Sequence, residues 1–217
     1  MNNVLVVAVH PDDETLGCGG TLLKYKDNND KINWLICTDI HKDNPNYKKR
    51  QNEIKKIQEL YDFDSVHKLE FETTKVDEHT MSEIINRISD IINKVKPNII
   101  YIPFKNDVHS DHRKIFEATY SCTKSFRYPF IKKIYMMETL SETEFACSQG
   151  ENFIPNVFND ISTYFSKKLE IMKIYQSELS EHPFPRSLET IEAIAKFRGS
   201  TSNCKYAESF VLIKEIS

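Results

Sequence analysis

Short apolar runs recur along the chain, and each is long enough for one β-strand. Residues 4–9 are all apolar. Such an unbroken run is typical of a strand that is buried on both faces of a parallel sheet. Similar runs predict further strands at 31–38, 65–71, 99–102, 131–137 and 209–216.

Between these runs, apolar residues return at the spacing of an α-helix. The clearest case is 80–95, where Ile84, Ile88 and Ile92 fall on one face and Pro97 ends the helix. Comparable patterns predict helices at 14–26, 46–61, 160–179 and 187–198, and another that begins at Ser110 or Asp111. Residues 140–160 follow neither pattern, so we expect irregular structure there.

Alternating strands and helices indicate an α/β fold. We predict a single Rossmann-like domain over residues 1–217, with three layers and a mostly parallel sheet, because 217 residues fit one large domain better than two small ones. In such sheets, ligands bind beyond the carboxyl ends of the strands, where the strand order reverses. Candidate chemistry is therefore sought directly after the predicted strands.

Composition excludes several classes of protein. The 29 basic and 32 acidic residues are mixed along the chain and give a net charge of −3, which offers no basic footprint for nucleic acid. The N-terminal apolar run lacks a basic flank and is too short to span a bilayer, which takes about 20 residues. We expect a cytoplasmic protein with no integral membrane segment.

Cysteine usage agrees with a reducing compartment. The five cysteines are odd in number and scattered, without CxxC spacing, which argues against a disulfide framework or a thiolate zinc site. They are Cys18, Cys37, Cys122, Cys147 and Cys204.

Two polar loops carry the candidate chemistry. The loop at 10–14 reads His-Pro-Asp-Asp-Glu directly after the first strand, and the loop at 109–112 reads His-Ser-Asp-His shortly after the strand at 99–102. A catalytic zinc ion takes three nitrogen or oxygen ligands and leaves one position open. His10, Asp13 and His112 would make such a site. In the alternative interpretation, the aspartates cap a helix and the second loop is merely polar.

The two motifs together resemble the LmbE-like or PIG-L-type family of zinc-dependent N-deacetylases. The resemblance rests on 8–14 followed by Gly17, Gly19 and Gly20, and on His109-x-Asp111-His112; it extends to Arg50-x-x-Glu53 and to the segments 185–199 and 206–210. It covers nearly the full chain and is weakest at 62–96 and 140–160. One departure is Leu60-Tyr61, where the family commonly has Leu-Gly; we expect a changed turn there and unchanged chemistry.

The resemblance implies a role for each matching residue. The zinc ligands fall on His10, Asp13 and His112, and the catalytic carboxylate, a general base and then a general acid, falls on Asp12. His109 corresponds to the histidine that stabilises charge during the reaction, and Asp111 to the carboxylate that orients a histidine. We expect His109, held by Asp111, to be protonated, although the sequence leaves open which histidine Asp111 contacts. Iron(II) would also suit two histidines and one carboxylate.

Other residues keep two interpretations. Arg50 would bind substrate or form a surface salt bridge with Glu53 or another neighbour. Arg186 and His182 lie in a proline-framed loop that borders the pocket or is only structural. We interpret the glycines at 17–20 as sites of close backbone approach and not as a phosphate cradle, because they match neither GxGxxG nor a P-loop.

The predicted function is zinc-dependent removal of an N-acetyl group from an N-acetylated amino sugar, in a glycoside, a nucleotide sugar or a lipid-linked sugar. One alternative is a zinc amidase that acts on another N-acyl substrate, of the thiol-conjugate or antibiotic type. Another is a non-catalytic sugar- or nucleotide-binding domain. The predicted partner is a small amino-sugar substrate, and a homo-oligomer is left open.

Overall fold

The computed structural model describes residues 1–146 and 152–217. The strands in these ranges are β1 (Asn3–Ala8), β2 (Lys31–Asp39), β3 (Ser65–Glu72), β4 (Ile99–Ile102), β5 (Lys133–Met137), β6 (Val157–Asp160) and β7 (Ala207–Glu215). The helices are α1 (Asp13–Asp27), α2 (Tyr47–Tyr61), the 3-10 turn η1 (Val76–Glu78), α3 (Met81–Val95), α4 (Ser110–Ser121), α5 (Phe165–Met172) and α6 (Leu188–Thr201).

The described strands form one seven-stranded sheet with the order β3-β2-β1-β4-β5-β7-β6. The first five strands are parallel, whereas β7 runs antiparallel to both β5 and β6. The predicted α/β fold with a mostly parallel sheet is therefore confirmed. The chain proceeds outward from β1 to β3 and then returns to the other side of β1 for β4, so the strand order reverses between β1 and β4.

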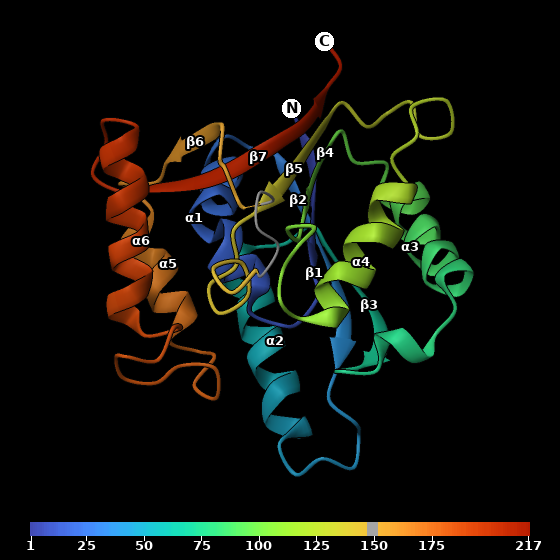
Figure 1. The fold of residues 1–217 in the computed structure, drawn as a ribbon, viewed down its shortest axis with the longest axis horizontal. Coiled ribbons are helices and arrows are strands. Elements are labelled where there is room, and N and C mark those ends of the chain that lie inside the picture. The colour runs from blue at the N-terminus through green and yellow to red at the C-terminus, as the bar shows by residue number, and fades with distance from the viewer. Residues whose placement is uncertain (147–151) are drawn as a thin grey trace.

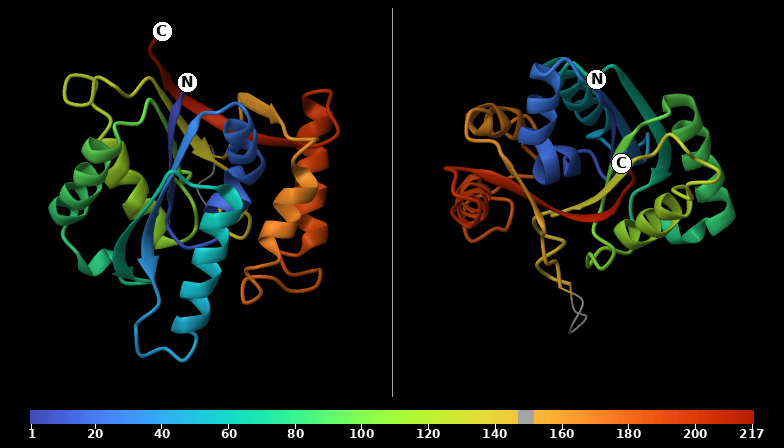
Figure 2. Two further views of the ribbon diagram at one scale, coloured as in Figure 1. Left: turned by 180° about the vertical axis from the view of Figure 1, so that it is seen from behind. Right: turned by 90° about the horizontal axis from the view of Figure 1, so that it is seen from above.

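Helices cover both faces of the sheet because β1 presents apolar side chains to each side in turn. Val4 and Val6 belong to a core cluster that includes residues of α1, α2, α5 and α6. Leu5 and Val7 belong to a second cluster with residues of α3 and α4. Figures 1 and 2 show α3 and α4 on one side of the sheet and α1, α5 and α6 on the other.

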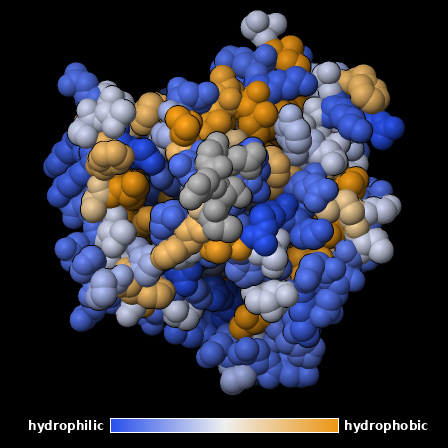
Figure 3. All heavy atoms as spheres, in the orientation of Figure 1, coloured by the Kyte–Doolittle hydropathy of each residue, from blue (hydrophilic) through white to orange (hydrophobic). Residues whose placement is uncertain are grey.

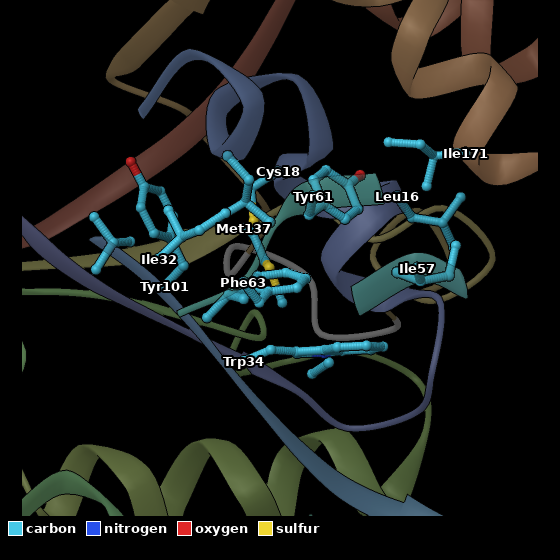
Figure 4. Packing of buried hydrophobic residues seen from close by; sticks show 14 of the residues in the cluster. Leu16, Cys18, Ile32, Trp34, Ile57, Tyr61, Phe63, Tyr101, Met137 and Ile171 are labelled. Atoms are coloured by element: carbon cyan, nitrogen blue, oxygen red, sulfur yellow. The ribbon is translucent and has the colours of Figure 1, made fainter. Parts of the chain in front are cut away.

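Aromatic side chains fill much of the first cluster. Trp34 of β2 stacks on Phe63 with ring centroids 5.3 Å apart and an interplanar angle of 23°. Tyr61 packs against the same phenylalanine at 5.2 Å. Figure 4 shows these rings together with Ile57 and Met137, which brings β2, β5 and the end of α2 into one apolar layer.

The glycines after the first motif allow close approach, as predicted. A Cβ atom on Gly17 would lie 2.7 Å from Met137 Sδ, and one on Gly20 would lie 2.8 Å from Ile161 Cβ. The backbone N–H groups of Gly20 and Thr21 each donate to the Glu208 carboxylate at 2.8 Å. A side-chain carboxylate of the protein thus occupies the place that the phosphate-cradle interpretation would give to a ligand.

Two predicted boundaries are wrong. The segment 140–160, expected to be irregular, contains the edge strand β6, which pairs with β7 through its backbone. Its side chains are half-buried or exposed, so no buried apolar run marks it in the sequence. The helix predicted over 160–179 extends only over Phe165–Met172, and the following residues form turns that bring Tyr175 into the core.

Four of the five cysteines, Cys18, Cys37, Cys122 and Cys204, are free thiols, and Cys147 lies outside the described residues. No helix in the described ranges is long and apolar enough to cross a membrane. The face of the molecule drawn in Figure 3 is largely hydrophilic, with apolar side chains in small groups.

Candidate active site

Both motif loops lie at the carboxyl ends of β1 and β4, where the strand order reverses. His10 and Asp12 lie in the loop after β1, and Asp13 begins α1. His109 caps the N-terminus of α4, whose first turn carries Asp111 and His112. This edge of a parallel sheet is where ligands bind in open α/β folds. Tertiary structure thus joins two segments that are about a hundred residues apart in the sequence.

Three side chains converge on one point. His10 Nδ1 lies 3.3 Å from His112 Nε2, and both lie near Asp13 Oδ2, at 3.9 and 3.4 Å. One ligand atom from each of the three residues lies within 4.8 Å of the others. Two imidazoles and one carboxylate form the donor set of many catalytic zinc sites. His10, His109 and Asp111 form a second such group that shares His10.

Carboxylates behind the two histidines determine which nitrogen faces this point. Asp107 Oδ2 lies 2.8 Å from His112 Nδ1, and Asp111 Oδ2 lies 3.4 Å from His10 Nε2. Ionised carboxylates only accept hydrogen bonds, so these two nitrogens carry the protons. The lone pairs of His10 Nδ1 and His112 Nε2 then face each other and Asp13. Such a cluster of acceptors is stable only around a cation or a proton.

The electrostatics of the buried histidine agree with this attraction for positive charge. Burial by itself lowers the pKa of His112, but the carboxylates of Asp13 and Asp107 outweigh burial and raise that pKa to about 9. The pKa of Asp111 is lowered. Burial by itself would raise this pKa, but hydrogen bonds from His10 and the Thr74 N–H hold it below its ordinary value. The residues present therefore fit a divalent metal ion.

Asp12 stands beside this group with a strained backbone and a buried carboxyl. Its φ of 142° lies in a region that residues with a side chain rarely adopt, and strain of this kind gathers at active sites. Its side chain makes no capping hydrogen bond to α1, which removes the helix-cap interpretation for this residue. Burial, followed by the charge of Asp13, raises its pKa well above the ordinary value.

A buried network supports the Asp12 backbone. Glu14 Oε2 accepts the Asp12 N–H at 3.2 Å, and Glu14 Oε1 accepts the hydroxyls of Thr15 and Tyr175 at 2.5 and 2.9 Å. Burial raises the pKa of Glu14 to about 7, although the hydrogen bonds from Thr15 and Tyr175 oppose this rise. Glu14 thus connects the motif loop to Tyr175, which lies 161 residues further along the chain.

His109 differs from its predicted state. Its Nδ1 accepts the Asp111 backbone N–H at 3.1 Å, whereas the Asp111 carboxylate lies 3.8 Å from the same nitrogen and contacts His10. Burial, together with the nearby His10, lowers the pKa of His109. The ring is therefore neutral, with its proton on Nε2, which leaves a hydrogen-bond donor directed away from the helix cap.

A cavity of about 340 Å³ lies over these residues. Its walls come from the two motif loops, from the ends of β2 and β3, and from the segments around 140 and 180; the lining residues are His10, Pro11, Asp12, Asp13, Asp39, Ile40, Arg50, Thr73, His109, Thr139, Ser141, Glu142, Glu178 and Arg186. Ligand sites typically measure about 300–1,000 Å³ and carry a few convergent polar groups.

The two arginines considered from sequence both line this cavity. Arg50 Nη1 donates to the Pro11 carbonyl oxygen at 3.0 Å, Arg50 Nη2 contacts Glu178, and Arg50 Nε lies 3.9 Å from Glu53. Arg186 also contacts Glu178. Arg50 therefore both lines the cavity and forms an ion pair with Glu178.

Sequence reasoning missed several site residues. Asp107 precedes His112 by five residues, and a carboxylate so near a candidate histidine ligand is a signal that could have found it. Tyr175 and Glu178 lie in turns far from either motif, and the sequence contains no signal for them. Their positions follow only from the packing of α5 and α6.

Comparison with known proteins places the chain in a family. The family model for PIG-L, the GlcNAc-PI de-N-acetylase, matches residues 5–123, which is more than half of the chain and includes both motifs. The chain belongs to the PIG-L family. The resemblance noted from the sequence is thereby confirmed.

Individual relatives resemble this chain in sequence and in fold. The diacetylchitobiose deacetylase of Thermococcus kodakarensis is 24% identical over 231 residues, which cover 100% of this chain and 85% of that protein. The conserved protein TT1542 from Thermus thermophilus superposes with a TM-score of 0.79 at 22% identity, covering 100% and 97% of the two chains. N,N'-diacetylchitobiose deacetylase from Pyrococcus horikoshii superposes with a TM-score of 0.78 at 19% identity. The superposition covers 97% of this chain and 83% of that one.

Proposed function

We propose that this protein is a zinc-dependent hydrolase that removes the N-acetyl group from an N-acetylated amino sugar. The observation that carries the proposal is the convergence of the free lone pairs of His10 and His112 with the Asp13 carboxylate, beside a buried Asp12. Membership of the PIG-L family and the likeness to diacetylchitobiose deacetylases support an amino-sugar substrate. We further infer one Rossmann-like domain over residues 1–217, which the single sheet supports.

His10, Asp13 and His112 would hold the zinc ion. When bound, zinc acts as a Lewis acid that makes a water molecule a stronger nucleophile and polarises a carbonyl oxygen. Asp107 and Asp111 keep the two histidines in the tautomer that binding requires. These interactions are set before substrate arrives, since they lie within the folded protein.

Asp12 would move the proton. Its raised pKa suits a carboxyl that takes a proton from the attacking water and delivers it to the leaving amine as the C–N bond breaks. The neutral His109 would donate its Nε2 hydrogen to the acyl oxygen as negative charge develops there. Acetate and the free amino sugar are the products.

The cavity would hold the sugar. Its lining includes side chains that bind hydroxyl groups, among them Asp39, Thr73 and Ser141. Arg50 remains our candidate for a contact with a single substrate hydroxyl, because it lines the cavity and its hydrogen bonds to Pro11 and Glu178 do not use all five of its N–H donors.

The test is release of acetate by zinc-loaded protein from a panel of N-acetylated glycosides. We expect Asp12→Asn to lose about 10²- to 10⁴-fold in kcat while it retains zinc, because only the proton transfer is removed. Asp43→Asn, at a side chain that is 91% exposed, is the matched control and should behave as wild type. If the protein cleaves other acyl amides but none of the N-acetylated glycosides, it is an amidase with a different substrate and the proposal is wrong. Full activity of Asp12→Asn would refute the role given to Asp12.

A further inference from the structure

Glu178 holds two guanidinium groups at the wall of the cavity. One of its carboxylate oxygens contacts Arg50 Nη2, and the other lies 3.3 Å from Arg186 Nη2. The three side chains are 13–21% exposed, so the ion pairs are partly desolvated. Screening by solvent is weaker there than at an open surface.

Further donors of both arginines also make hydrogen bonds within the protein. Arg50 Nη1 donates to the Pro11 carbonyl. Arg186 Nε donates to the Glu178 carbonyl at 3.0 Å, and Arg186 Nη1 donates to Ser141 Oγ at 2.8 Å. Arginine binds phosphate and carboxylate groups through paired donors of one fork. With these donors engaged, neither arginine presents a free fork to a ligand.

The rest of the wall is acidic. Besides Glu178, the cavity is lined by the carboxyl groups of Asp12, Asp13, Asp39 and Glu142, so five acidic side chains face two basic ones. A divalent cation would offset two of the five. An anionic group that entered the cavity would meet carboxylates on several sides, and among the described lining residues both arginines are already paired with Glu178.

We propose that Glu178 is a specificity-determining residue that keeps Arg50 and Arg186 from binding anions, and that the substrate is an uncharged N-acetylated glycoside. This inference rests on the proposed deacetylase function. The same deacetylation could be carried out on neutral or on phosphorylated sugars, and the inference chooses between them. We expect the enzyme to reject sugars whose phosphate is attached to the N-acetylated ring, as in nucleotide sugars. Like-charge contacts are a common means of rejecting a wrong ligand.

The direct test compares matched neutral and anionic substrates with the zinc-loaded wild-type enzyme. We expect kcat/KM for the methyl glycoside of N-acetylglucosamine to exceed that for N-acetylglucosamine 1-phosphate and for the 6-phosphate by about 100-fold. Equal values for the neutral and phosphorylated sugars would overturn the proposal. This comparison uses no variant, so it stands even where a substitution impairs folding.

Glu178→Gln assigns the effect to this residue. Loss of the charge frees the two guanidinium groups, so the preference for the neutral sugar should shrink at least tenfold. Glu181→Gln, at an exposed glutamate of the same segment, is the control and should keep the wild-type ratio. An unchanged ratio in Glu178→Gln would refute the role of Glu178.

Binding of inorganic phosphate gives a readout that does not depend on turnover. Measured by calorimetry on zinc-loaded protein, Glu178→Gln should bind phosphate at least tenfold more tightly than wild type, and the double variant Glu178→Gln/Arg186→Gln should lose most of that gain. Phosphate held by the metal is common to all three proteins and cancels in the comparison. Failure to release acetate from any sugar would refute the deacetylase function, whereas equal phosphate affinity in wild type and Glu178→Gln would refute the role of Glu178.

Discussion

At the scale of single residues, the site depends on carboxylates that never touch the proposed metal ion. Asp107 and Asp111 each bind the far nitrogen of one histidine, and both side chains are 0% exposed. Asp107 is itself fixed by the Thr143 hydroxyl at 2.7 Å, and Asp111 by the Thr74 N–H. Each imidazole is thereby held in one tautomer and one orientation, which reduces the reorganisation that metal binding requires.

Asp107→Asn should therefore weaken zinc binding by about 10- to 100-fold, because the neutral amide keeps a hydrogen bond to His112 but removes the charge that makes its imidazole a stronger ligand. Competition against a chromophoric chelator measures the affinity. Asp90→Asn, on the exposed side of α3, is the matched control and should bind zinc as wild type does. Unchanged affinity in Asp107→Asn would mean that Asp107 does not support His112.

At the scale of elements, α1 is two helical segments joined at a break. Cys18 has non-helical angles, φ −146° and ψ 21°, so the backbone groups on either side lose their helical partners. Lys168 of α5 donates to the Leu16 carbonyl at 2.9 Å, and Glu208 of β7 accepts the N–H groups of Gly20 and Thr21. The two side chains also pair with each other at 2.7 Å. The buried Lys168–Glu208 ion pair thus supplies hydrogen-bond partners to backbone groups on both sides of the break, directly behind the loop at 10–14.

Lys168→Met should lower the free energy of unfolding by about 3–5 kcal/mol, since it leaves Glu208 as an uncompensated buried charge. Lys167→Met is the control from the adjacent position: Lys167 is 45% exposed and pairs with Glu170, so its loss should cost about 0–1 kcal/mol. Urea denaturation of both variants gives the comparison. Similar changes in the free energy of unfolding for the two substitutions would contradict the role assigned to the Lys168–Glu208 pair.

At the scale of the whole molecule, the cavity is assembled from segments spread along most of the chain. The loops after β1 and β4 supply the histidines, while the turns between α5 and α6 supply Glu178 and Arg186. A cation at His10, Asp13 and His112 would join the loops on either side of the point where the strand order reverses. Metal binding would therefore stabilise the folded state as a whole, because the unfolded chain does not hold these ligands together.

Zinc at a hundred times its dissociation constant should raise the free energy of unfolding by about 2.7 kcal/mol, and removal of zinc by a chelator should reverse the gain. Scanning calorimetry with and without the chelator measures the change. His112→Ala should abolish the response to zinc. His41→Ala, at a histidine that is 62% exposed, should retain it. A stabilisation by zinc that persists in His112→Ala would place the ion elsewhere.

The sequence by itself determined the elements that have a local signature. The unbroken apolar run of residues 4–9 and the stripe of isoleucines in α3 predict buried elements because burial on a strand or helix repeats at a fixed spacing. The motifs around His10 and His112 are also visible, since each is a few adjacent residues at the end of such an element. Strand β6 and the end of α5 lack a comparable signature, and the sequence predicted them wrongly.

Tertiary structure decided the contacts that join distant segments. It directs the Asp111 carboxylate to His10, because the distance between these side chains depends on how β1 and β4 lie side by side. It also brings Glu178 to Arg50 across 128 residues of sequence. Spacing along the chain carries no information about such pairs, since they form only when distant strands, helices and turns come together in the folded protein.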